Sequence, residues 1–207
     1  MKKKNSWDNI LFKIKYFFSY TIWTPFRCMK NFFFCLRYPF WKTYNVWTGK
    51  FCGYKFTEYD AIPEGWKIAF GKQLSEELRK TIKEEKERIY QQDHKKLKTR
   101  DLIHWSQIKE KYGTLRLYAT TTEKIFQVLH KYEEMSEHYC INCGQPVEYA
   151  THGWIMYLCE QCFLDDISHL TFKDDQELLE YMSSCSIKNI NDTDTDNSEG
   201  EELKENA

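Results

Sequence analysis

Cys140-Ile-Asn-Cys143 and Cys159-Glu-Gln-Cys162 decide how the C-terminal part of this chain folds. Each pair has two residues between its cysteines, and residues 144–158 separate the two pairs. Two intervening residues let one tight turn direct both sulfurs at a single ion, and four thiolates complete the tetrahedron that Zn²⁺ prefers. The spacing therefore predicts a four-cysteine zinc site. The predicted ligands are Cys140, Cys143, Cys159 and Cys162.

The residues around the two pairs indicate a zinc ribbon. Gly144 directly follows the first pair, where such a turn usually needs a positive φ that glycine adopts without strain. His152-Gly153 separates two short stretches rich in apolar and aromatic residues, and we interpret it as the tip of a hairpin. Redox-active cysteine pairs and an iron–sulfur or catalytic metal site are the alternatives. A shell of four thiolates favours a structural zinc, because a catalytic zinc keeps one position open to water.

Signatures of catalysis are weak throughout the sequence. It contains no GxSxG and no HExxH pattern, and it lacks the H-x-E stretch and the P-C-x-x-C pair of a zinc deaminase. A zinc-braced HNH-type nuclease does not fit either, since the stretch between the pairs is too short to hold its catalytic residues. We interpret His138 and His152 as exposed residues rather than substitute ligands. The prediction is a protein without enzymatic activity; the alternative is an unrecognised site near a hairpin, formed by Glu64, Arg116, His130 and Glu133.

Hydrophobic periodicity predicts the elements before the cysteines. Leu74, Leu78, Ile82 and Ile89 form a stripe at helical spacing, which predicts a helix of about 20 residues. Residues 103–118 alternate around Gly113 and predict a β-hairpin with one buried face. A capping box, Thr120-x-x-Glu123, predicts the start of the next helix, and residues 174–182 predict a short last helix. The expected fold class is α+β, a small helix and β-hairpin body with a C-terminal four-cysteine zinc ribbon.

The two ends of the chain carry opposite charge. Residues 1–50 contain ten Lys or Arg and the single acid Asp8, a net charge of +9, whereas residues 191–207 contain seven Asp or Glu and Lys204, a net charge of −6. The acidic end has almost no apolar side chain to bury, so we expect it to be disordered. The predicted organisation is a basic aromatic segment over 1–50, an α+β body over 51–124, a helix with the zinc ribbon over 125–184 and a disordered tail over 185–207.

The basic segment is also rich in aromatic residues. Aromatic rings mixed with cations suit an anionic membrane interface, or single-stranded nucleic acid on whose bases the rings stack, or a hydrophobic cap over the body. The longest stretch without charge, residues 16–26, contains Pro25 and is too short to cross a bilayer. The scattered cysteines outside the two pairs suit a reducing cytosol. We therefore expect a cytoplasmic protein with a peripheral membrane contact.

The chain resembles an uncharacterised group of small zinc-ribbon proteins met in phages and prophages. The residues that carry the resemblance are Glu64-Gly-Trp-Lys-Ile-Ala-Phe-Gly71, Gln107-Ile-Lys-Glu-Lys-Tyr-Gly-Thr-Leu-Arg-Leu-Tyr118, Tyr132-Glu133, Ser136, and the two cysteine pairs, the first of them followed by Gly144. The likeness covers roughly residues 54–165, with Thr114 standing where such proteins often have a second glycine. It implies the fold and the Zn²⁺, and it names no activity.

These observations predict a non-enzymatic zinc-ribbon adaptor from a phage or mobile element. Its basic aromatic end, residues 1–50, is expected to dock on an anionic membrane surface; the alternative is a nucleic-acid-binding zinc-ribbon protein. The macromolecular partner is not identified by the sequence.

Overall fold

The computed structural model describes residues 24–187, and every structural statement below concerns this part of the chain. Residues 1–23 of the basic aromatic segment lie outside the described residues, and so does the acidic sequence from residue 188 onward, including the tail predicted to be disordered. The described part mixes helices with two small antiparallel hairpins, which confirms the predicted α+β class.

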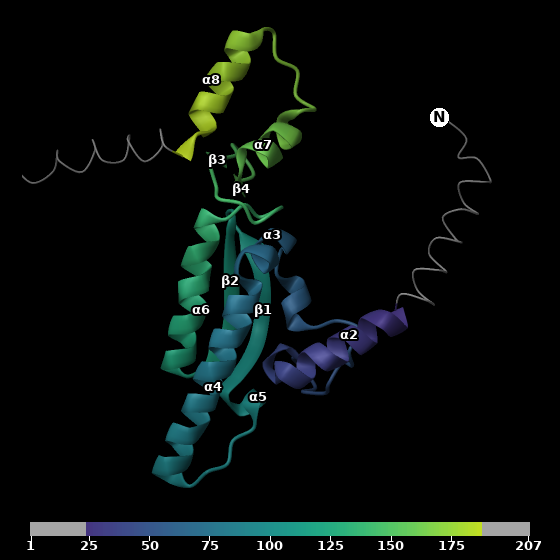
Figure 1. Ribbon diagram of the computed structural model, residues 1–207, viewed down its shortest axis with the longest axis vertical. Coiled ribbons are helices and arrows are strands. Elements are labelled where there is room, and N and C mark those ends of the chain that lie inside the picture. Colours follow the sequence, from purple (N-terminus) through teal and green to yellow (C-terminus); the bar gives the residue numbers. More distant parts are fainter. Residues whose placement is uncertain (1–23, 188–207) are drawn as a thin grey trace, which may run out of the picture.

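A long helical run forms one side of the body (Figure 1). It begins with α3 (Glu64–Trp66), passes through the π-helical turn η4 (Lys67–Gly71) and continues as α4 (Lys72–Asp93). Leu74, Leu78 and Ile82 of α4 are buried, as their spacing of four residues predicts. The helix ends at Asp93, and its C-cap residue, His94, adopts a left-handed backbone with φ of 52°. The predicted long helix is confirmed.

The predicted β-hairpin lies next to this helix. Strands β1 (Ile103–Lys111) and β2 (Thr114–Thr121) pair antiparallel, and the turn contains Tyr112 and Gly113, both with positive φ. A bulge lies between Trp105 and Gln107. The short helix α5 (Thr99–Leu102) leads into β1. One face of the hairpin is buried against the helices, because its apolar residues alternate along the strands.

Helix α6 (Glu123–Met135) lies beside α4 along the hairpin (Figure 1). Its buried residues include Ile125, Val128, Leu129 and Tyr132. The capping box predicted at Thr120 is wrong, because β2 continues to Thr121 and the N-cap residue is Thr122. Thr120 pairs with His104 across the hairpin, and the Thr121 hydroxyl donates to the Leu102 carbonyl at 2.8 Å. Thr120 and Thr121 thus belong to β2, although the predicted capping box placed the start of the helix there.

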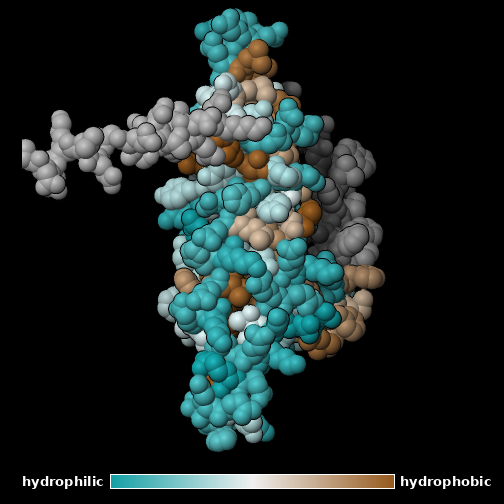
Figure 2. Space-filling model, turned by 60° about the vertical axis from the view of Figure 1, so that its left-hand side comes forward, coloured by the Kyte–Doolittle hydropathy of each residue, from teal (hydrophilic) through white to brown (hydrophobic). Residues whose placement is uncertain are grey.

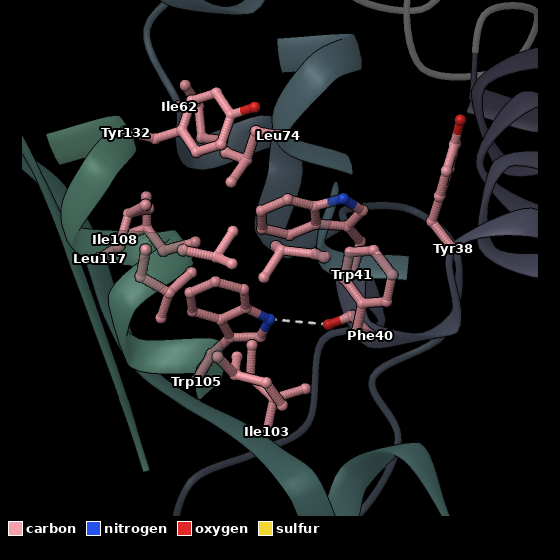
Figure 3. Close-up of a cluster of buried hydrophobic side chains, with 14 of the residues drawn as sticks. Tyr38, Phe40, Trp41, Ile62, Leu74, Ile103, Trp105, Ile108, Leu117 and Tyr132 are labelled. Carbon is pink, nitrogen blue, oxygen red and sulfur yellow. Dashed lines mark hydrogen bonds between the residues drawn. The ribbon is translucent and has the colours of Figure 1, made fainter. Parts of the chain in front are cut away.

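Part of the basic aromatic segment belongs to the core of the body. After α2 (Thr24–Arg37), the 3₁₀ turn η2 (Pro39–Trp41) inserts Phe40 and Trp41 among side chains of α4 and β1 (Figure 3). The indoles of Trp41 and Trp105 stack with centroids 4.9 Å apart, and the Trp105 indole donates to the Phe40 carbonyl at 2.7 Å. A division of the chain at residue 50 therefore cuts through one continuous core.

Helix α2 lies to one side of the body in Figure 1 and is attached to it through its middle and its C-terminal end. The Asn31 amide donates to the Tyr54 carbonyl at 3.0 Å. At the C-terminal end, the Tyr38 hydroxyl donates to Glu76 of α4 at 2.6 Å, and Arg37 forms an ion pair with the same carboxylate. Hydrogen bonds from Tyr38 and Arg37 lower the pKa of Glu76 to about 2. Glu76 therefore stays ionised, and this attachment is retained, throughout the neutral pH range.

The cysteine pairs lie in a second, smaller core at one end of the body (Figure 1). The 3₁₀ turn η5 (Ser136–His138) leads into it from α6, and its elements are β3 (Tyr149–Ala150), β4 (Tyr157–Leu158), α7 (Glu160–Ile167) and α8 (Asp175–Cys185). The rings of Tyr149 and Phe163 stack with centroids 4.4 Å apart. Cys185 is fully buried, and the Ile187 N–H donates to the Glu148 carbonyl at 3.1 Å. Packing of the chain against this core thus continues past the predicted limit at residue 184.

The loop tip and the last helix of this core agree with the sequence predictions. Gly153 lies in the turn between β3 and β4 with φ of 77°. The Asp174 carboxylate caps α8 by accepting from the Glu177 N–H at 2.9 Å.

Among helices in the described residues, none has the length and apolar character that crossing a membrane would require.

Candidate metal centre

The four predicted cysteines meet at one point of the ribbon. Their sulfur atoms all lie within 4.8 Å of one another, and the Cys143 and Cys159 sulfurs are 3.4 Å apart. A tetrahedral metal with sulfur bonds of about 2.3 Å needs sulfurs separated by about 3.8 Å. All eight cysteines of the chain lie in the described residues and none is in a disulfide. The cluster can therefore hold a metal ion.

Backbone N–H groups surround the first cysteine pair. Burial acts to raise the pKa of Cys140, but N–H groups of Cys159, Cys143 and Asn142 directed at its sulfur outweigh that effect and lower the pKa. Burial raises the pKa of Cys162, and the neighbouring sulfurs add to this effect. Four crowded thiols cannot all ionise without a cation between them. The cage of N–H donors around a soft donor set matches what a thiolate-bound metal requires.

We call each cysteine pair with its turn a knuckle, and the first knuckle, Cys140–Gly144, has the tight turn that its sequence predicts. Gly144 has φ of 77°, and its N–H donates to the Cys140 carbonyl at 2.9 Å. The Cys140 N–H in turn donates to the Gln145 carbonyl at 2.7 Å. These bonds close the loop so that both cysteine side chains point to the same side.

The second knuckle differs because it is the start of a helix. Cys159 is the N-cap residue of α7, and Cys162 lies within the first turn. The positive end of a helix favours negative charge, so this position suits thiolates. Sequence reasoning missed α7; the signal that could have found it is Glu160 in the first turn, followed by Phe163 and Ile167 at a spacing of four residues.

The body braces the first knuckle through the Glu64-Gly-Trp66 stretch. The Gly65 N–H donates to the Ile141 carbonyl at 3.0 Å, and the Trp66 indole donates to the Tyr139 carbonyl at 2.9 Å. A Cβ atom on Gly65 would lie 2.2 Å from the Cys140 carbonyl oxygen. Glycine is thus required here because the α3 backbone touches the backbone of the knuckle directly.

Replacing Gly65 by alanine is expected to destabilise the protein by about 1–3 kcal/mol, the usual cost of overpacking. The sign of the change in stability shows whether the contact between α3 and the knuckle is present. Alanine is the better helix former by about 1 kcal/mol, so without the contact the G65A variant would gain stability. Chemical denaturation followed by circular dichroism measures the change, and metal retention against a chelator reports on the knuckle. A stabilised G65A variant that retains metal as well as the parent protein would contradict this bracing role.

The other candidate residues do not join the metal cluster or one another. The His152 ring nitrogen Nε2 lies 3.0 Å from the Ser184 hydroxyl, and His138 ends η5 as an exposed residue. Glu64 pairs with Lys67 at 3.0 Å, and His130 lies 3.5 Å from Glu134.

Only two members of the alternative enzyme site lie together. Arg116 and Glu133 line one open hollow beside the hairpin, where Glu133 accepts from the Leu117 N–H. Glu64 and His130 do not line this hollow. The four residues proposed as an enzyme site therefore do not converge.

Comparison of the chain with protein-family models, curated proteins and solved structures finds no match.

Proposed function

We propose that this protein is a non-enzymatic adaptor whose ribbon is stabilised by a structural Zn²⁺ and whose helix α2 docks it on an anionic membrane surface. The four thiols support the choice of metal, since a closed shell of soft donors suits zinc and leaves no position for substrate. The resemblance to phage and prophage zinc-ribbon proteins remains a proposal that rests on the sequence motifs.

The outward face of α2 carries the docking proposal. Phe26, Met29, Phe33 and Leu36 are 62%, 51%, 62% and 60% exposed. Their spacing of three, four and three residues puts them on one face of the helix, opposite the buried Asn31 and Cys35. A stripe of large apolar side chains in this position marks a contact with a partner or a membrane.

The charge around this stripe favours an anionic surface. Residues 24–50 include Arg27, Lys30, Arg37, Lys42 and Lys50 and no Asp or Glu. Arg27 and Arg37 pair with Asp60 and Glu76 of the body, whereas Lys30, Lys42 and Lys50 form no ion pair with a carboxylate among residues 24–187. Cations beside apolar side chains are typical of helices that lie in the headgroup region of a membrane. The face shown in Figure 2 is largely hydrophilic, with smaller hydrophobic patches both within it and along its edge.

Aromatic rings extend the surface of α2 onto the neighbouring loop. Phe33, Phe32, Tyr54, Phe51 and Tyr44 form a chain of rings in which successive centroids are 5.4, 5.2, 4.9 and 5.7 Å apart. We call these five residues the aromatic band. Aromatic side chains are enriched at membrane interfaces, where an apolar ring and a polar edge are both accommodated. The band gives the docking surface more breadth than one helix supplies.

Vesicle sedimentation tests the docking proposal. Full-length zinc-loaded protein is expected to sediment with vesicles that contain phosphatidylserine and much less with phosphatidylcholine alone. The double variant Phe33→Ser with Leu36→Ser is expected to weaken binding at least tenfold, since burying each such side chain contributes about 1.5–3 kcal/mol. Leu179→Ser, at an equally exposed position on α8, is the matched control and should bind like the parent protein.

Three results would contradict membrane docking. Equal binding by the double variant and the Leu179 control would place the contact elsewhere. Binding to single-stranded RNA or DNA with a steep salt dependence, and not to vesicles, would favour the nucleic-acid alternative. Concentration-dependent dimerisation that the double variant abolishes, without vesicle binding, would assign the stripe to a second copy of this chain.

A further inference from the structure

A pocket of about 200 Å³ lies where the chain after α2 meets the start of the hairpin. Its apolar lining includes Phe40, Ile103 and Trp105, which are all at least nine-tenths buried. Glu58 of η3 (Glu58–Ala61), Lys98 before α5, and Thr99 and Arg100 on α5 complete it. Three separate parts of the chain, residues 39–49, Glu58 and residues 98–105, therefore build this pocket, and the zinc ribbon takes no part in it.

The rim of the pocket is positively charged. Lys42, Lys98 and Arg100 line it, and none of the three forms an ion pair with a carboxylate among residues 24–187. Lys98 and Arg100 are exposed, so they are free to contact a group at the mouth. Arginine and lysine are the side chains that recognise phosphate oxygens.

Aromatic rings form much of the wall. Phe40, Tyr44 and Trp105 all line the pocket, and the Arg100 guanidinium lies over the Tyr44 ring, 5.3 Å from its centroid. Trp105 is held rigidly by its stack on Trp41 and by its bond to the Phe40 carbonyl. A wall of fixed rings suits a flat, unsaturated ligand.

One carboxylate lies among these cations. Glu58 lines the pocket and is half-buried. Burial raises the pKa of Glu58, although Thr43 and His104 act in the opposite direction. His104 donates from Nδ1 to the Trp105 carbonyl, because a carbonyl oxygen can only accept, so Nε2 is left for other partners. Glu58 thus offers an acceptor to a ligand N–H inside an otherwise basic site.

We propose that this pocket binds a nucleoside monophosphate. The base lies against the aromatic wall and donates an N–H to Glu58, while the phosphate contacts Lys98 and Arg100 at the rim. The volume supports this division, because about 200 Å³ is below the roughly 300 Å³ at which pockets for whole drug-sized ligands begin. A flat base fits such a space, and the sugar and phosphate then lie at the mouth where the exposed cations are.

Isothermal titration calorimetry on full-length zinc-loaded protein tests this site. AMP, GMP, CMP and UMP are titrated separately, with ribose 5-phosphate and inorganic phosphate as probes that lack the base. At least one nucleotide is expected to bind, and to bind at least tenfold more tightly than ribose 5-phosphate. Absence of measurable heat for every nucleotide at millimolar concentration would overturn the proposal, and so would equal binding of ribose 5-phosphate.

Two variants separate the roles of the cation and the carboxylate. Arg100→Gln is expected to weaken nucleotide binding about tenfold, whereas Lys96→Gln, an exposed cation outside the pocket and four residues earlier, should leave binding unchanged. Glu58→Gln is expected to weaken nucleotide binding, because the base loses a charged hydrogen-bond acceptor. The same variant is expected to strengthen binding of inorganic phosphate, because the negative charge that repels phosphate is removed. Equal losses of nucleotide affinity in R100Q and K96Q would contradict the role given to Arg100. A change in the same direction for nucleotide and for inorganic phosphate in E58Q would contradict the role given to Glu58. Unchanged thermal melting of each variant shows that folding is retained.

Discussion

Replacing Cys140 by alanine is expected to release the metal and to unfold the ribbon while the body keeps its helices. Cys140 is fully buried and belongs to the second core together with Leu158 and Phe163. Apparent binding of structural Zn²⁺ in small zinc peptides is about 10–16 kcal/mol, which is as large as the whole stability of a typical domain. A ribbon of two-residue strands has too small a core to remain folded without that contribution.

Zinc content and amide hydrogen exchange measure this effect. The parent protein should contain one equivalent of zinc and the C140A variant none, and protection should be lost in residues 145–187 while α4 and α6 remain protected. Cys52→Ser is the matched control, since Cys52 is exposed and lies outside the metal cluster. A C140A variant that keeps protected amides in α7 and α8 without metal would overturn the zinc assignment.

Replacing Trp41 by alanine is expected to destabilise the body by about 3–5 kcal/mol, the usual cost of truncating a buried tryptophan. Its side chain is 0% exposed, stacks on Trp105, and donates from the indole to the Ser75 hydroxyl at 3.0 Å. Truncation leaves a cavity beside Trp105 and removes the donor to a buried hydroxyl. Urea denaturation followed by circular dichroism measures the free energy of unfolding.

Trp47→Ala provides the control for this measurement. Trp47 is 93% exposed and lies further along the same basic aromatic segment. Its replacement is expected to change the free energy of unfolding by less than about 0.5 kcal/mol. Similar small effects of W41A and W47A would mean that this segment is not part of the body, and the residue-50 boundary predicted from the sequence would then be correct.

The elements that the sequence predicts correctly depend on patterns between near neighbours. The stripe through Leu74, Leu78 and Ile82 marks α4 because an apolar residue at every fourth position can face only one side of a helix. Gly113 marks the turn of the hairpin because the backbone there needs positive φ. The capping box predicted at Thr120 is wrong because pairing with His104 on the neighbouring strand outweighs the local helix signal.

The aromatic segment shows where sequence reasoning stops. Composition treats Phe33 and Phe40 alike, yet Phe33 is exposed on α2 and Phe40 is buried in the core. Which of them is buried depends on partners far along the chain, such as Trp105, which packs in one core with Phe40. The same holds for Glu58 and Arg100, whose place in one pocket follows only from how η3 and α5 are brought together.

By itself, the sequence predicted the cluster of four cysteines, whose sulfurs lie close enough together to hold a metal ion, and the long helix and hairpin of the body. These features follow from ligand spacing and from periodicities of two and about 3.6 residues, which act over a few residues. Only the tertiary structure decided that Gly65 and Trp66 hold the knuckle, that Trp41 completes the body core and that α2 turns an apolar stripe outward. The physical reason is that burial and backbone contact are properties of pairs of surfaces, and a side chain acquires them only when a distant segment packs against it.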